Sequence, residues 1–180
     1  MMRLRDAAPA PWRNGGGVTR ELLAWPAPGD WRVRLSVAEV ERDGPFSPFP
    51  GVRRWFAVLS GGGVRLTVDG KATELTPRDA PFEFGGAAQT RCELLAGTTR
   101  DFNLMARSGA ARMHRVNHSH AAQCRAASLV AAYSHAGNAR VGCAGETLEL
   151  PPQTLAWRIL ETDERVEIAG GDALWMEIAP

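Results

Sequence analysis

The sequence of 180 residues predicts an all-β fold with two barrel-like or sandwich-like halves. Short runs of alternating apolar and polar residues recur along the chain, and a period of two is typical of half-buried strands. Glycine, proline and Asp-Gly signals separate many of these runs, as expected of turns between strands. No long segment has the 3.6-residue period of an amphipathic helix, and one segment repeats at a constant offset. These observations together favour a barrel or a sandwich.

The clearest strand pattern lies between residues 31 and 38. Apolar residues occupy the odd positions from Trp31 to Val37, and polar or small residues occupy the even positions from Arg32 to Ala38. This alternation predicts a half-buried strand. Further short runs predict strands at residues 55–59, 64–68, 92–96, 102–106, 128–133, 155–160 and 174–178.

One segment is echoed 75 positions later. Residues 65–77 (RLTVDGKATELTP) align without gaps on residues 140–152 (RVGCAGETLELPP), with identical arginine, glycine, glutamate, leucine and proline positions. One interpretation is chance similarity, because hairpins converge on the same turn residues. The other is a duplicated β-barrel unit, in which case residues 108–123, rich in alanine, histidine and arginine, would join the two halves.

Composition and charge exclude several classes of partner. The hydrophobic fraction of 44% and the charged fraction of 23% are ordinary for a globular protein. The formal net charge is +1 and the arginines form no basic block, so we expect no nucleic-acid partner. No apolar stretch is long enough to cross a bilayer, so we expect no membrane association.

The N-terminal residues and the cysteines indicate a cytoplasmic protein of bacterial type. Residues 1–12 contain no apolar core of a secretory signal. Cys92, Cys124 and Cys143 are odd in number and share no spacing typical of metal ligands. Reduced thiols are the expected state without an export signal.

The segment from Pro11 to Arg20 (PWRNGGGVTR) is the most informative part of the chain. Three consecutive glycines follow Trp12, Arg13 and Asn14. Glycine allows positive φ and close approach of the backbone, but it is costly in entropy to order. The segment is therefore either a loop shaped around a ligand or an arm whose glycines only turn the chain.

Four separated motifs resemble those of the HutD/Ves family, in the family's order and spacing. They are PWRNGGGVTREL, WRVRLSVAEV, DGPFSPFPGVRR and RDFNLMAR, which together extend from Pro11 to Arg107. The resemblance implies a bicupin, that is, two cupin barrels from one chain. We expect an N-terminal cupin-like barrel at residues 1–107, which carries the motifs, and a shorter C-terminal half at residues 108–180. The resemblance also implies a regulatory or metabolite-binding role connected with histidine utilisation.

Cupins usually bind a metal through histidines and a glutamate, and this chain lacks that pattern. The alignment places Arg54 at the glutamate position and Gln89 at the last histidine position. A guanidinium has no lone pair to donate, so Arg54 would repel a metal. His118 and His120 are the one tempting pair, but they fall in the predicted connector and are interpreted as solvated loop histidines. We therefore predict no metal and no cofactor.

Strand alternation groups the residues that could line a pocket together, although either face of each strand could be the inward one. Arg34 and Ser36 share one face of their strand, and Asn103 and Met105 share a face with Asp101. The proline-rich segment that contains Phe46, Ser47 and Phe49 is either a lip over a barrel mouth or a connector whose phenylalanines plug the core. The candidate ligand-binding residues are Trp12, Arg13, Asn14, Arg34, Ser36, Phe46, Ser47, Phe49, Arg54, Asn103 and Met105.

The expected function is metal-independent binding of a small anionic metabolite. Arg13, Arg34 and Arg54 are the candidates for gripping a carboxylate, which guanidinium binds in a bidentate fork. The alternative is an enzyme without a metal, acting on an amino-acid-derived substrate. No catalytic residue is predicted, because no acid–base set is evident and the first half contains no histidine. A protein-interaction module is a third possibility, and fold analogy predicts a homodimer.

Overall fold

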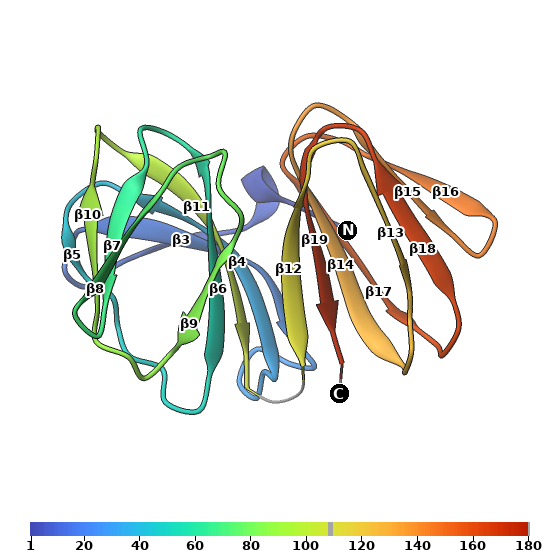
Figure 1. Cartoon of the computed structure of the whole chain (residues 1–180), viewed down its shortest axis with the longest axis horizontal. Helices are drawn as coiled ribbons and strands as arrows, with labels where there is room; N and C mark the ends of the chain where they lie inside the picture. The colour runs from blue at the N-terminus through green and yellow to red at the C-terminus, as the bar shows by residue number, and fades with distance from the viewer. Residues whose placement is uncertain (108–109, 180) are drawn as a thin grey trace. The chain divides into compact units, whose positions relative to one another are not determined.

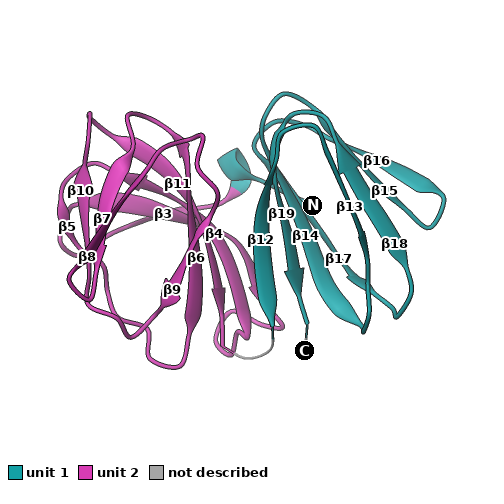
Figure 2. Cartoon of the chain, viewed as in Figure 1, with its two compact units in different colours: residues 1–6, 109–180 teal, residues 7–108 magenta. Residues whose placement is uncertain are grey.

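The structure is a computed structural model that describes residues 1–107 and 110–179. The chain divides into two compact units, which are coloured separately in Figure 2. The N-terminal unit is Ala7–Ser108, and the C-terminal unit consists of Met1–Asp6 and Gly109–Pro180. Within the described ranges, no helix is long and apolar enough to cross a membrane.

The N-terminal unit consists of two antiparallel sheets (Figure 1). The six-stranded sheet contains, in spatial order, β2 (Pro9–Pro11), β3 (Gly17–Trp25), β4 (Val33–Val40), β11 (Thr99–Ala106), β6 (Arg53–Ser60) and β9 (Phe82–Gly85). The four-stranded sheet contains β5 (Gly44–Pro45), β10 (Thr90–Leu94), β7 (Val64–Val68) and β8 (Lys71–Leu75).

The C-terminal unit is also built from two antiparallel sheets. Its five-stranded sheet contains β1 (Met2–Arg3), β17 (Thr154–Leu160), β14 (Ser128–Ala136), β19 (Asp172–Ile178) and β12 (Ala111–Val116). Its four-stranded sheet contains β13 (Ser119–Gln123), β18 (Arg165–Ala169), β15 (Ala139–Cys143) and β16 (Glu146–Leu150). One turn of 3-10 helix, η1 (Leu4–Asp6), follows β1.

The two units repeat the same strand order. The order β4-β11-β6-β9 in the first unit corresponds to β12-β19-β14-β17 in the second, and β5-β10-β7-β8 corresponds to β13-β18-β15-β16. The echoed segments form equivalent hairpins, in which Arg65 lies opposite Glu74 and Arg140 lies opposite Glu149. Of the two interpretations of the echo, the strand order supports duplication.

Two predicted boundaries differ from the structure. The predicted connector at residues 108–123 contains β12 and β13, although residues 108 and 109, at the predicted division, lie outside the described residues. Its weak apolar pattern hides these strands, since their backbones pair with β19 and β18 whatever the side chains are. Residues 1–6 were expected in the N-terminal half but belong to the C-terminal unit, where β1 pairs with β17 and Leu4 is buried.

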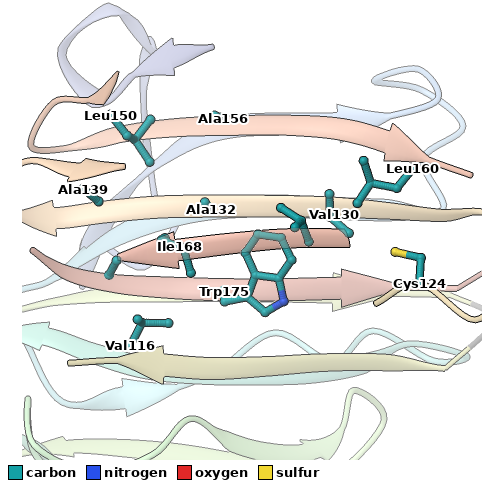
Figure 3. Close-up of a cluster of buried hydrophobic side chains, with 12 residues drawn as sticks. Val116, Cys124, Val130, Ala132, Ala139, Leu150, Ala156, Leu160, Ile168 and Trp175 are labelled. Atoms are coloured by element: carbon teal, nitrogen blue, oxygen red, sulfur yellow. The ribbon is translucent and has the colours of Figure 1, made fainter. Parts of the chain in front are cut away.

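Each unit has its own buried core between its sheets. Phe56, Leu66 and Phe84 belong to the core of the N-terminal unit. Figure 3 shows the core of the C-terminal unit, where Trp175 lies among small and branched side chains such as Ala132. The N-terminal core therefore relies on several phenylalanines and the C-terminal core on one tryptophan.

The two echoed hairpins have the same two-residue turn. Asp69 and Gly70 have φ values of 46° and 81°, and Ala144 and Gly145 have values of 51° and 80°. Positive φ at both central residues is the mark of a type I′ turn. Aspartate tolerates this conformation, whereas the Cβ of alanine is strained in it.

We expect Ala144→Asn to raise the free energy of unfolding by about 0.5–1 kcal/mol, because asparagine relieves the left-handed strain. Chemical denaturation measures the change. Asp69→Ala is the matched control at the equivalent turn, and it should lower stability, since it also removes the acceptor of the Gln89 backbone N–H. A destabilised Ala144→Asn variant would contradict this account of the turn.

Candidate functional site

A cavity of about 670 Å³ opens in the N-terminal unit. Its walls come from the inward faces of β4, β6 and β11, the loop before β3 and the proline-rich segment around β5. All eleven candidate residues border it, namely Trp12, Arg13, Asn14, Arg34, Ser36, Phe46, Ser47, Phe49, Arg54, Asn103 and Met105. The volume is within the range of small-molecule sites.

Arg54 is the central polar group of this cavity. Its side chain comes from β6 and is only 5% exposed. Its Nη2 donates a hydrogen bond to Asn103 Oδ1 at 3.1 Å, whereas its buried Nε has no partner among the described residues. The guanidinium carbon lies 5.2, 5.7 and 5.0 Å from the ring centres of Phe46, Phe49 and Phe84. Arg54 is therefore held in an aromatic cage with donor capacity to spare.

Burial sets the electrostatics of Arg54. Desolvation, followed by the positive charge of Arg34, lowers the pKa of its guanidinium from 12.5 to about 10. Arg54 therefore stays protonated at neutral pH. No carboxylate of the described residues forms an ion pair with Arg54, so only the ring faces and Asn103 compensate the charge. A buried cation without an anion is costly, and a bound anion would relieve that cost.

Strand alternation places the other polar side chains. Arg34 and Ser36 both project into the cavity from β4, while Leu35 is fully buried on the opposite face. Arg34 Nε lies 2.6 Å from Glu21 Oε2, so this arginine is already paired. Asn103 and Met105 both reach the cavity from β11, on the shared strand face that alternation predicts for them. Among the described residues, Arg13 and Arg54 of the lining have no ion-pair partner, whereas Arg34 has one.

The loop before β3 borders the mouth of the cavity. Trp12 Nε1 donates to Thr19 Oγ1 at 2.7 Å, and Asn14 Oδ1 accepts from the Gly16 N–H at 3.0 Å. A Cβ on Gly17 would lie 2.2 Å from the Glu39 carbonyl oxygen, so only glycine fits there. The glycines therefore turn the chain tightly against β4, and this turn leaves the exposed Arg13 at the mouth.

The proline-rich segment combines the two roles considered for it. Phe46 packs edge-on against Trp12 with ring centres 6.1 Å apart, and it contacts the core through Phe56 at 5.9 Å. Phe46 also faces the cavity, as do the half-buried Phe49 and the exposed Ser47. The segment is thus both a wall of the cavity and a cover for the core.

Comparison with known proteins identifies the family. The HutD family model matches residues 4–176. The chain belongs to the HutD family. An uncharacterized 21.2 kDa protein in the hutC 3′ region of Pseudomonas putida is 44% identical over 108 residues, which cover 58% of this chain and 56% of that protein. Protein Ves of Cronobacter sakazakii is 40% identical over 97 residues, which cover 53% of this chain and 54% of Ves. The chain thus spans little more than half the length of these relatives.

Solved structures agree with this assignment. HutD from Pseudomonas fluorescens SBW25 has a TM-score of 0.85 and 30% identity, with coverage of 99% of this chain and 96% of that one. A conserved protein of unknown function from Pseudomonas aeruginosa PAO1 has a TM-score of 0.86 and 30% identity over 98% of this chain and 96% of that chain. A cupin barrel protein from Leptotrichia buccalis, at 8% identity and a TM-score of 0.54 over 91% of this chain and 89% of that one, shares the fold alone. The predicted family and bicupin fold are confirmed.

The cavity of this HutD-family chain does not fit the metal that many cupins bind. As far as the chain is described, the lining contains three arginines and no aspartate, glutamate, histidine or cysteine. Guanidinium groups cannot ligate a divalent ion. Within residues 1–107 and 110–179, no group of three or more such ligands lies close enough to hold a metal.

The histidine pair of the C-terminal unit differs from its prediction. His118 is exposed, but His120 lies on β13 and stacks on His114 of β12 with ring centres 5.3 Å apart. His120 Nε2 also lies 3.8 Å from Glu177 Oε1. His120 is therefore a half-buried strand residue and not a solvated loop histidine, because residues 110–123 contain β12 and β13.

Asp101 is the polar residue for which the sequence predicted no role. It is fully buried on β11, two residues before Asn103, and does not line the cavity. The Thr99 hydroxyl donates to its Oδ2 at 2.8 Å, and its Oδ1 has no partner among the described residues. Burial raises the pKa of Asp101 from 3.8 to about 7. In the sequence, the only indication that Asp101 is buried was its place on the same strand face as Asn103 and Met105.

We expect Asp101→Asn to stabilise the protein more at pH 8 than at pH 5. The unfolded carboxyl has a pKa near 3.8 and the folded one a pKa of about 7, so folding takes up a proton between these values. Stability therefore falls as pH rises through this window, by about 2–4 kcal/mol in all, and the amide variant escapes the loss. Denaturation at both pH values measures it. An equal effect at pH 5 and pH 8 would show that Asp101 does not titrate in this range.

Proposed function

We propose that the N-terminal cavity binds a small anionic metabolite without a metal, and that the protein acts in the regulation of histidine utilisation. The single observation that carries this proposal is the buried, protonated Arg54, which has an unused Nε–H and no carboxylate partner in residues 1–107 and 110–179. A carboxylate there would gain charge-assisted hydrogen bonds in a desolvated site. The rings of Phe46, Phe49 and Trp12 offer contacts to an apolar body of the same ligand.

The link to histidine utilisation rests on relatives. One is described as lying in the hutC 3′ region of Pseudomonas putida, and another is HutD itself. A control role would need a ligand whose concentration reports on the pathway. Acids derived from amino acids have the required charge and size.

The alternative is a metal-independent enzyme acting on an amino-acid-derived substrate. Ser36 and Ser47 supply hydroxyl groups that could act as nucleophiles, but the described part of the lining includes neither an imidazole nor a carboxylate to serve as a base. Binding without turnover is therefore the function that we favour. Multiple turnover of any acid that binds would reverse this preference.

The test compares two neighbouring arginines of β6. Thermal unfolding is followed against succinate, glutamate and imidazole-containing carboxylic acids, with neutral sugars as a parallel arm. A ligand that binds only the folded state adds about 2.7 kcal/mol at a hundredfold excess over Kd. We expect Arg54→Met to abolish the shift without lowering stability in buffer, because it removes an uncompensated buried charge. Arg53→Met is the matched control, since Arg53 is exposed and paired with Glu83.

Two outcomes would contradict the proposal. The first is stabilisation by neutral sugars and by none of the acids. The second is an equal loss of the acid-dependent shift in Arg54→Met and Arg53→Met, which would trace the shift to general surface charge.

A homodimer is the assembly that we propose, on fold analogy. β8 and β16 each end a sheet of the described chain, and exposed edge strands can pair between copies. Sedimentation velocity tests this directly. A monomer at all accessible concentrations would contradict it.

A further inference from the structure

The C-terminal unit contains a second cavity, of about 510 Å³. It lies between the inward faces of β14 and β17 on one side and the β15–β16 hairpin on the other. Its wall is mainly apolar, and Val130, Ala132, Ala156 and Leu160 all belong to it. Its size is suitable for a small-molecule ligand.

This cavity exists because two alanines occupy the places of two phenylalanines. In the N-terminal unit, Phe56 of β6 lies opposite Phe82 of β9. In the C-terminal unit, Ala132 of β14 lies opposite Ala156 of β17. Both pairs precede the β-bulge of their central strand by the same distance, since the bulges fall after Val58 and after Ser134. The two phenyl rings that fill the interior of the N-terminal unit are thus missing at the equivalent positions of the C-terminal unit.

Trp175 closes the inner end of this cavity. Ala132 lies directly opposite Trp175 of β19, just as Phe56 lies opposite Asn103. Trp175 is 1% exposed and lies beside Ala132 and Val130 in Figure 3. Its Nε1 donates to Glu177 Oε1 at 2.8 Å, so its polar atom is satisfied and its ring serves as an apolar wall.

Opposite charges stand at the rim. Arg158 lies across from Val130, whereas in the first unit Arg54 lies across from Phe84, so the arginine has moved to the neighbouring strand. Arg158 Nη1 is 3.9 Å from Glu146 Oε2, and the two side chains are 52% and 85% exposed. Such a long and exposed pair is weak. Arg158 Nη1 also lies 4.0 Å from Cys143 Sγ. Because both contacts of Arg158 are long and exposed, both charged groups can turn toward a ligand.

We propose that this cavity binds a small zwitterion with an aromatic or branched apolar body, of the class of the apolar α-amino acids. The apolar body fills the space left by the missing phenyl rings and contacts Trp175. The ligand carboxylate meets Arg158 and its ammonium meets Glu146. One cation and one anion a few ångströms apart complement a zwitterion better than they complement a simple acid or a simple amine.

The test uses four probes that share a phenyl ring. They are L-phenylalanine, 3-phenylpropionate, 2-phenylethylamine and ethylbenzene. Each is titrated by thermal unfolding against the full chain and against its Arg54→Met variant, in which the N-terminal cavity has lost its buried cation. We expect a saturable rise in the midpoint with phenylalanine, and binding about tenfold weaker for each probe that lacks one charge. In Arg158→Gln, phenylalanine should bind only as tightly as 2-phenylethylamine, which lacks the carboxylate. In Glu146→Gln, it should bind only as tightly as 3-phenylpropionate, which lacks the ammonium group.

A cavity-filling variant tests the location. Ala132→Phe combined with Ala156→Phe restores the ring pair of the first unit and should abolish the response to phenylalanine. Arg54→Met, in the other unit, should preserve it. Should the double variant fail to fold, the wild-type protein supplies a second measurement at Cys143. This half-buried thiol lines the cavity while Cys92 and Cys124 are buried, so saturating phenylalanine should slow its alkylation about tenfold or more.

The outcomes separate cleanly. No response to any probe, or an undiminished response in the filled variant, would overturn the site. Equal binding of ethylbenzene and phenylalanine would overturn the assigned role of the rim. If Arg54→Met loses the response to phenylalanine while the cavity-filling variant keeps it, phenylalanine binds in the N-terminal cavity, and the proposal is also overturned.

Discussion

The antiparallel pairing of short strands imposes the constraint on which both units depend. Every second side chain of each strand must enter a space enclosed by two sheets. At equivalent strand positions of the two units, the size of the inward-facing side chains decides whether the space is a packed core or a cavity. In the N-terminal unit, β4, β6 and β11 send arginines, an asparagine and a serine inward at the cavity. The hydrogen bond between Arg54 and Asn103 joins β6 and β11 at the wall of the cavity.

The same framework distributes its aromatic residues differently in the two units. In the first, Phe56 and Phe82 fill the side next to β9, and the opening lies on the side of β4 and Arg54. In the second, Trp175 takes the place of Asn103, and the opening lies next to β17. The different placement of rings and small side chains on the same framework accounts for two cavities of different character, one cationic and one apolar with a charged rim.

Some elements of the fold were predictable because their side chains alternate strongly. The strand around Leu35 and the echoed hairpins fall in this class, since a buried face and a type I′ turn leave clear residue patterns. β12 and β13 were not predictable, because they contain few large apolar residues and their pairing depends on backbone hydrogen bonds to β19 and β18. The placement of residues 1–6 was hidden for the same reason, since β1 is a short strand held by β17.

By itself, the sequence determined the family, the two-part β architecture and the sets of residues that share a strand face. It also determined that Arg34 and Ser36 lie on one face of their strand, and that Asn103 and Met105 lie on one face of theirs. Only the tertiary structure decided that these sets, together with Trp12 and Arg54, border one cavity, because strand order and register bring together segments as far apart as residues 12 and 105. It alone decided that Arg54 pairs with no carboxylate of the described residues and that Asp101 is sealed from water, because the dielectric environment of a charge depends on what surrounds it in space.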